Sequence, residues 1–454
     1  MARLFGTDGV RGLANRELTP ERAFELGRAG AAYLRAQSQE AHPTVVVGKD
    51  TRRSGDMLEA ALCAGICAVG VNVKRLGVLP TPGVAWLTRR LGAVAGVMIS
   101  ASHNPSPDNG IKFFGSNGFK LPDAVEDAIE SLMNQPGEIP RPVGEALGRI
   151  SEAHDLTARY LDDVAALLPA GLSGLKVVVD CGHGAAYALG PALLRRLGAE
   201  VIPLHTEPDG DNINRECGST HLHFLQEAVV AAKADLGLAF DGDADRLLAV
   251  DHTGVSVDGD RLMLICLRHG VSTGRLASPS VVATVMSNMG FEDAIKAMGG
   301  EFVRAKVGDR YVLEEMLRRN IRLGGEQSGH LIFLDDNTTG DGLISALRVL
   351  EAVRASGRSL RDLAADMVSY PQLLHNLRVQ HLAGWAENAS IAAAVAEAEQ
   401  ELRGTGRILL RASGTEALLR LMVEGREQAQ IEAIASRLAK VIYQELSPAP
   451  TVLA

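Results

Sequence analysis

The sequence predicts an α/β fold: three tandem α/β domains of similar topology and a smaller C-terminal α+β domain. The first observation behind this prediction is a repeat, in which a strand, a polar loop, a helix, a glycine and a second strand follow one another. Its first strands begin near residues 45, 177 and 281. Strands that alternate with helices in this order form mostly parallel sheets covered by helices. The second observation is that the repeat ends at about residue 370. The chain beyond it reads as a helix at 391–402, strands at 407–411 and 418–424, and a helix at 428–445.

The length of the chain agrees with several domains. Its 454 residues exceed one compact domain, and at roughly 150 residues per domain we expect three or four. A segment rich in proline and glycine at 134–148, and changes of pattern near 251–258 and 369–373, mark the expected boundaries. The predicted domains are therefore 1–150, 151–254, 255–368 and 369–454.

Composition excludes several classes of protein. The net charge is −9 and aromatic residues make up 4% of the chain, which disfavours nucleic-acid binding. No uncharged apolar run approaches the roughly 20 residues of a membrane span, and residues 1–12 lack the apolar core of a signal peptide. The five cysteines show no metal-like spacing. These features predict a soluble cytoplasmic protein that binds neither membranes nor nucleic acid, and they leave a monomer and a homodimer both open.

The first elements in the chain are a loop and a helix. Residues 6–12 read as a glycine-punctuated loop that presents Thr7 and Arg11, with a simple entry turn as the alternative. Thr19 is expected to cap the following helix, because proline and glutamate occupy the next two positions. Ser54 is expected to cap the helix that follows the first strand of the first repeat.

A serine stands at the end of the next strand. The apolar run 94–99 reads as a buried strand and is followed by a polar loop that carries Ser102 and His103. Pro105 and Pro107 restrict the backbone of this loop. A stiff loop suits a nucleophile, although an ordinary polar loop is the alternative for a Ser-His pair considered alone.

Three aspartates follow a strand of the second repeat. Asp241, Asp243 and Asp245 come directly after the apolar run 236–240, and on an extended segment carboxylates spaced by two point the same way. Two such charges about 4 Å apart repel by on the order of 4 kcal/mol at an effective dielectric constant near 20. A divalent ion relieves this repulsion, and all-oxygen ligation favours Mg²⁺. An EF-hand is excluded, because Arg246 occupies the position that requires glycine; a charged hairpin tip is the alternative.

A phosphoryl group on Ser102 would need further positive charge. It would add a charge of about −1.5 to −2 beside the aspartates. Lys112, Arg246 and His103 are the candidate cations. Phosphoryl transfer asks the protein mainly for positioning and charge stabilisation, which a metal and basic side chains supply.

Two further loops carry candidate ligands for a phosphosugar. Backbone N–H groups, hydroxyls and guanidinium groups suited to a phosphate occur at Arg411, Ser413, Gly414, Thr415 and Arg420, with an ordinary turn as the alternative. Carboxylate and hydroxyl groups suited to vicinal sugar hydroxyls occur at Glu326 and Ser328, where a hairpin turn is the alternative, and another short polar loop carries Asp309.

With these stretches in view, the sequence resembles the α-D-phosphohexomutase family over essentially its whole length. The resemblance rests on four stretches in the family's order: the serine loop at 100–105, the metal loop at 241–246, the sugar loop at 325–330 and the phosphate loop at 411–416. One departure is Ala417, where proline usually follows in the family, which affects the stiffness of the phosphate loop but not its hydrogen-bonding groups.

The resemblance implies four domains around a central cleft and an intramolecular phosphotransferase of the isomerase class. It implies a phosphorylated Ser102, with Mg²⁺ between that phosphate and the three aspartates. Residues 5–12, 212–220 and 307–311, together with Gln327, resemble the branch of the family that acts on glucosamine phosphates. That branch interconverts glucosamine 6-phosphate and glucosamine 1-phosphate through glucosamine 1,6-bisphosphate, a step toward bacterial cell-wall amino sugars. A mutase for glucose or mannose phosphates and a non-catalytic phosphosugar-binding regulator are the alternatives.

Overall fold

The computed structural model describes residues 3–6, 8–412 and 418–447, which fold into two compact units. The first unit comprises Met1–Thr284 and Val303–Ala365, and the second comprises Val285–Phe302 and Asp366–Ala454. None of the helices in the described ranges is long and apolar enough to cross a membrane.

The first sheet of the first unit has six strands in the order β1-β5-β4-β2-β3-β6. Parallel pairing joins β2 (Thr44–Lys49) to β3 (Asn72–Val78) and β4 (Ala95–Ile99), and β3 to β6 (Ile150–Glu152). Antiparallel pairing joins β5 (Asp108–Gly115) to β4 and to β1 (Val10–Leu13). This sheet is therefore parallel at its centre and antiparallel at one edge.

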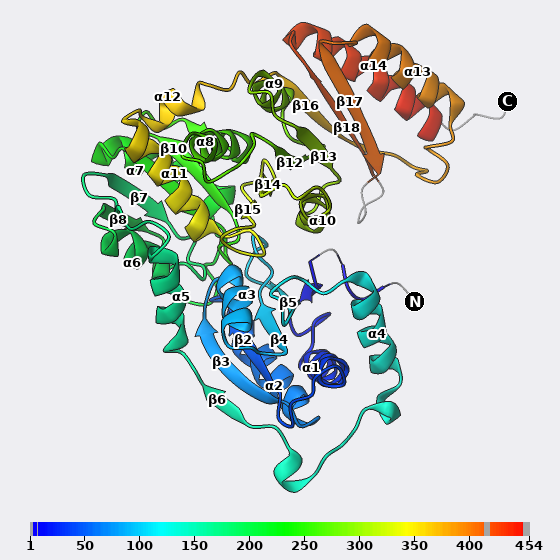
Figure 1. The fold of residues 1–454 in the computed structure, drawn as a ribbon. Helices are drawn as coiled ribbons and strands as arrows, with labels where there is room; N and C mark the ends of the chain where they lie inside the picture. Colours follow the sequence, from blue (N-terminus) through cyan, green and yellow to red (C-terminus); the bar gives the residue numbers. More distant parts are fainter. Residues whose placement is uncertain (1–2, 7, 413–417, 448–454) are drawn as a thin grey trace, which may run out of the picture. The chain divides into compact units, whose positions relative to one another are not determined.

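Helices cover both faces of this sheet (Figure 1). On one face, α1 (Pro20–Arg35) and α2 (Ser54–Cys67) share a core with Val45 and Val47 of β2, and α4 (Asp123–Asn134) packs against α1. Helix α3 (Thr81–Arg90) lies on the other face, over Gly48, because residues of one strand alternate between faces. A Cβ at Gly48 would lie 2.6 Å from the side chain of Val84, so glycine permits this close packing.

The second sheet has the order β11-β10-β9-β7-β8. Its strands are β7 (Lys176–Asp180), β8 (Glu200–Leu204), β9 (Leu236–Phe240), β10 (Leu247–Asp251) and β11 (Ser256–Val257). The neighbouring helices are α5 (Leu156–Ala165), α6 (Leu189–Arg196), α7 (His223–Ala232) and α8 (Gly259–Ser272).

The third sheet has the order β13-β12-β14-β15. Its strands are β12 (Val281–Thr284), β13 (Phe302–Ala305), β14 (Leu323–Gly325) and β15 (Leu331–Phe333). Helices α10 (Asp309–Arg319), α11 (Gly342–Ser356) and α12 (Leu360–Ala364) follow in the same unit, whereas α9 (Met289–Ala297) belongs to the second unit.

The three sheets share one four-strand pattern, which confirms the repeat predicted from the sequence. Corresponding strand orders are β5-β4-β2-β3, β10-β9-β7-β8 and β15-β14-β12-β13. In each sheet one strand of this pattern (β5, β10 or β15) pairs antiparallel with the strand that precedes it in the sequence (β4, β9 or β14). The loops inside these three hairpins contain Ser102, the three aspartates and Glu326, so equivalent positions of the three repeats carry the three candidate loops.

The second unit contains a three-stranded antiparallel sheet in the order β16-β18-β17. Its strands are β16 (Gln372–Arg378), β17 (Gly406–Ala412) and β18 (Leu418–Gly425), and the helices α13 (Ala389–Glu401) and α14 (Gln428–Leu446) cover one face of it (Figure 1). This confirms the predicted C-terminal α+β fold.

Two local predictions were wrong. Ser54 is the first residue of α2 and not its cap, because the helix already includes it and Arg53 occupies the N-cap position. Its Oγ accepts a hydrogen bond from Nδ2 of Asn109 at 2.9 Å instead of one from the first turn. Arg11 lies in strand β1 and not in a loop, because Val10–Leu13 pairs with β5, a segment about a hundred residues away.

Candidate active site

Ser102 is held at the end of β4 in a strained conformation. Its φ angle is 52°, in the left-handed region that few residues other than glycine adopt, and the residue is 1% exposed. The backbone N–H of Ser102 donates to Oγ of Ser100 at 2.9 Å, and Oγ of Ser102 donates to Oδ2 of Asp241 at 2.6 Å. The hydroxyl is therefore aimed at the aspartate loop.

A buried arginine fixes the backbone around this serine. The guanidinium of Arg52 donates to the carbonyl oxygens of Ser102 at 3.0 Å, Asn104 at 2.8 Å and Asp108 at 3.0 Å, and also to that of Pro105. Its Nε donates to the carboxylate of Asp50 at 2.8 Å. The Ser102 loop is thus stabilised by a side chain from the end of a neighbouring strand.

We expect Arg52→Met to destabilise the protein by about 3–5 kcal/mol, because the change leaves the buried carboxylate of Asp50 without its cation and removes the guanidinium hydrogen bonds to four loop carbonyls. Urea denaturation measures this effect. Arg53→Met is the matched control, since its side chain is 71% exposed and pairs with Asp211 at the surface. Equal stability losses in the two variants would contradict the role assigned to Arg52.

The second repeat places the three aspartates together in a tight turn. Carboxylate oxygens of Asp241, Asp243 and Asp245 lie within 4.8 Å of one another, so the predicted convergence is confirmed. The predicted extended backbone is wrong: the loop turns at Ala244, whose φ angle is 54°. Gly242 permits close approach to the serine loop, because a Cβ there would lie 2.5 Å from the carbonyl oxygen of Ser102.

The aspartate trio fits a divalent cation. All three residues are buried, and within the described part of the chain Oδ1 of Asp243 and Oδ1 of Asp245 have no hydrogen-bond partner. Burial, together with Asp245 and Asp243, raises the pKa of Asp241 well above its ordinary value, which shows the cost of an uncompensated charge. An all-oxygen set of donors suits a hard cation.

Alternating charges connect the aspartate trio to residues from distant parts of the chain. Six ion pairs follow one another: Asp243 to Lys112 at 2.7 Å, Lys112 to Asp8 at 2.9 Å, Asp8 to Lys120, Lys120 to Asp309 at 2.6 Å, Asp309 to His330 at 3.6 Å and His330 to Asp245 at 3.5 Å. Burial disfavours the imidazolium, but Asp245 and Asp309 outweigh it and raise the pKa of His330 to about 9. The chain of ion pairs therefore begins and ends at the trio.

His103 lies beside the hydroxyl of Ser102. Its Nδ1 lies 3.4 Å from Oγ of Ser102. In the unphosphorylated protein, burial and the nearby guanidinium groups of Arg246 and Arg11 lower the pKa of His103 to about 4, so the imidazole is neutral near pH 7. Arg246 remains close to the trio, with its backbone N–H donating to Asp241 at 3.2 Å and its Nε 3.8 Å from Asp245, whereas Arg11 pairs with Asp8.

The third repeat presents Glu326 and Ser328 on the same side of a hairpin loop. Oγ of Ser328 donates to Oε2 of Glu326 at 3.4 Å, and Oε1 of Glu326 accepts from the backbone N–H of Gly308 at 3.0 Å. Asp309 is the first residue of α10 and not part of a loop.

In the second unit, Arg411 and Arg420 face each other across β17 and β18. Burial and the charge of Arg420 lower the pKa of Arg411. Nε of Arg420 is buried and has no hydrogen-bond partner among the residues described. Two adjacent guanidinium groups suit an anion. The predicted ligands Thr7, Ser413, Gly414 and Thr415 lie outside the described residues, as does nearly all of the predicted C-terminal tail.

Several residues at this site were not found from the sequence. Besides Arg52, they are Asn214, whose Nδ2 donates to the carbonyl oxygen of Ser102 at 2.8 Å, and Thr81, whose Oγ1 donates to Asp243 at 2.6 Å. The partners of Asn214 and Thr81 are more than 100 residues away, and the serine loop begins about 50 residues after Arg52, so local spacing carried no signal for these contacts.

A buried serine beside a cation-binding carboxylate trio, on repeated α/β units, defines a class of phosphosugar enzymes. The chain belongs to the phosphoglucomutase/phosphomannomutase family: models of the family's α/β/α domains I, II and III match residues 2–139, 158–254 and 258–370, and its C-terminal domain matches 374–441. The predicted family resemblance is thereby confirmed.

Relatives with a particular activity cover nearly the whole chain. A phosphoglucosamine mutase from Desulforamulus reducens is 55% identical over 97% of this chain and 99% of its own, and one from Desulforudis audaxviator is 56% identical over 98% of both chains. The crystal structure of a phosphoglucomutase/phosphomannomutase family protein from Burkholderia thailandensis matches with a TM-score of 0.81 and 24% identity over 97% of both chains, which shows the shared fold.

Proposed function

We propose that this protein is a phosphoglucosamine mutase that interconverts glucosamine 6-phosphate and glucosamine 1-phosphate, a reaction that supplies cytoplasmic amino-sugar precursors for the cell wall. The close relatives that carry this name support the choice of substrate. The observation that carries the catalytic proposal is the contact of 2.6 Å between Oγ of Ser102 and Asp241 inside the carboxylate trio.

In the proposed cycle, O1 of glucosamine 6-phosphate attacks the phosphorus of phospho-Ser102, and the bond from phosphorus to Oγ breaks. The resulting glucosamine 1,6-bisphosphate turns over in the site. Oγ of Ser102 then attacks the 6-phosphoryl group and the bond from phosphorus to O6 breaks, which restores the phosphoserine and leaves glucosamine 1-phosphate. Mg²⁺ held by Asp241, Asp243 and Asp245 would neutralise charge on the phosphoryl oxygens.

The remaining roles follow the chemistry of the side chains. Lys112, Arg246 and Arg11 provide positive charge around the phosphoryl group, and His103, whose Nδ1 lies 3.4 Å from Oγ of Ser102, is placed to hydrogen bond with it. The sugar is bound by Glu326 and Ser328, with Asp309 as a further contact. The phosphate that does not react is bound by Arg411, Ser413, Gly414 and Thr415, with Arg420 as a second guanidinium. Thr7 is a further substrate-binding residue.

We also propose the four domains 1–150, 151–254, 255–368 and 369–454. The spans of the four family matches and the shared strand order of the three sheets support this division.

Substrate turnover tests the proposal. We expect kcat/KM for glucosamine 6-phosphate to exceed that for glucose and mannose phosphates, and a trace of glucosamine 1,6-bisphosphate to increase the rate by restoring the phosphoserine. Preference for glucose or mannose phosphates would favour the second candidate, a phosphoglucomutase/phosphomannomutase. Binding without turnover of any hexose phosphate would indicate a regulator instead.

A further inference from the structure

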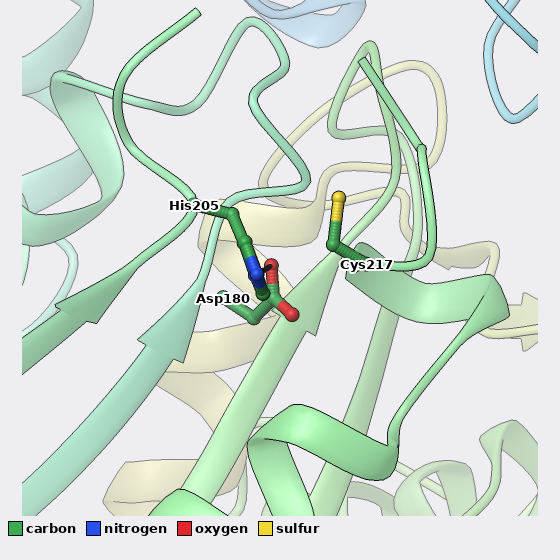
Figure 2. Close-up of side chains that lie close together, drawn as sticks. All are labelled: Asp180, His205 and Cys217. Carbon is green, nitrogen blue, oxygen red and sulfur yellow. Dashed lines mark ion pairs between the residues drawn. The ribbon is translucent and has the colours of Figure 1, made fainter. Parts of the chain in front are cut away.

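A second group of possible metal ligands lies in the second sheet, apart from the aspartate trio. Asp180 ends β7, His205 follows the end of the adjacent strand β8, and Cys217 precedes the short helix Gly218–Thr220. One carboxylate oxygen, one imidazole nitrogen and the sulfur lie within 4.8 Å of one another. Figure 2 shows the imidazole of His205 against the carboxylate of Asp180, with Cys217 on the neighbouring segment.

The carboxylate of Asp180 is fixed before any ligand binds. It is fully buried, and it accepts hydrogen bonds from the backbone N–H groups of Gly182 at 2.8 Å and Gly218 at 3.0 Å. A carboxylate has about four acceptor positions, so both oxygens keep capacity for a cation. Metal-binding carboxylates are commonly held by such hydrogen bonds.

The imidazole of His205 directs its Nδ1 at the carboxylate of Asp180. Its Nδ1 lies 3.0 Å from Oδ1 of Asp180, the distance of an ion pair, yet this buried atom meets no described group in hydrogen-bond geometry. The neighbouring His183 does not compete for this role, because its own Nδ1 accepts from the backbone N–H of Glu207 at 3.3 Å. A cation would replace this ion pair, with Nδ1 of His205 and the carboxylate of Asp180 both as its ligands.

The thiol of Cys217 completes the set. It is free and fully buried, and burial and the charge of Asp180 raise its pKa to about 12. A bound cation therefore has to displace the thiol proton, as is usual for cysteine ligands. The sequence did not indicate this cluster, because Cys217 lies 37 residues from Asp180 (217 − 180) and 12 residues from His205 (217 − 205).

We propose that Asp180, His205 and Cys217 bind a divalent ion of the zinc class. Zinc accepts sulfur, nitrogen and oxygen together in tetrahedral sites, whereas Mg²⁺ prefers oxygen alone, so the two sites of this chain select different ions. Bond lengths of about 2.0–2.3 Å place tetrahedral ligands about 3.5 Å apart. The three ligand atoms, which lie within 4.8 Å of one another, therefore have to draw closer when the ion binds. Water takes the fourth position.

The position of this site connects it to the serine loop. The segment between His205 and Cys217 contains Asn214, whose side chain donates to the carbonyl oxygens of Ser102 at 2.8 Å and Asn104 at 3.0 Å. An ion that joins both ends of this segment would hold Asn214 against the serine loop. The site is therefore structural, and its ligands do not take part in phosphoryl transfer.

Cobalt titration tests the site, with saturating Mg²⁺ present to occupy the aspartate trio. We expect one equivalent of Co²⁺ to produce a near-ultraviolet thiolate-to-cobalt charge-transfer band in the full-length protein, and Zn²⁺ to abolish it by competition. Cys217→Ser should remove the band. His205→Asn should weaken Co²⁺ binding at least about tenfold, while asparagine tolerates the φ angle of 50° at this position.

Cys67→Ser is the control, because Cys67 is a half-buried thiol on α2 outside the cluster, and its loss should leave the band unchanged. Far-ultraviolet circular dichroism verifies that each variant is folded. Absence of the band from the wild-type protein would overturn the proposal without reference to any variant. Persistence of the band in folded Cys217→Ser would overturn it equally.

Discussion

Ser102→Ala is expected to reduce mutase turnover by roughly 10⁴-fold or more, since loss of a nucleophile removes the covalent pathway entirely. We expect a fraction of the wild-type protein to be heavier by the mass of one phosphoryl group. Ser102→Ala should lack this heavier fraction. Steady-state kinetics and intact-mass spectrometry measure the two effects.

Ser106→Ala is the matched control for this substitution, because Ser106 lies in the same loop and is half-buried. It should retain both turnover and the phosphoryl mass. If Ser102→Ala still contained the fraction heavier by one phosphoryl group, or if Ser106→Ala lost that fraction, the phosphorylated residue would lie elsewhere in the loop.

Removal of the divalent ion should abolish turnover, and addition of Mg²⁺ should restore it. The reason is that three buried carboxylates beside a phosphoserine concentrate negative charge that the surrounding lysine and arginine residues only partly balance. Mg²⁺ at about 100 times its dissociation constant should also stabilise the folded protein by about 2.7 kcal/mol. Turnover assays and thermal denaturation after dialysis against a chelator measure these effects.

Asp241→Asn separates this prediction from a general effect of the ion. The substitution keeps an acceptor for the hydroxyl of Ser102 but removes one of the three charges. It should therefore weaken the stabilisation by Mg²⁺ and abolish turnover, whereas the exposed Asp211→Asn should change neither. Full activity in the chelated wild-type protein would show that the trio does not hold a catalytic ion.

Local sequence patterns were sufficient for the repeat and for the positions of the candidate loops. The strands Lys176–Asp180 and Leu236–Phe240 begin and end where the apolar runs predict, because a buried strand is a short run of apolar residues bounded by polar ones. The predicted cap Thr19 accepts a hydrogen bond from the backbone N–H of Arg22, since an N-cap depends only on its own turn.

The sequence by itself thus determined the fold class, the order of the loops and the family, all of which depend on neighbouring residues or on spacing along the chain. Only the tertiary structure decided that Arg52 holds the Ser102 loop, that a chain of ion pairs runs from Asp243 through Lys112 to His330, and that Cys217 meets His205. The physical reason is that each of these contacts joins groups whose separation is set by strand pairing and packing. Burial also lowers the pKa of a group such as His103, and no local sequence pattern encodes how deeply a side chain is buried.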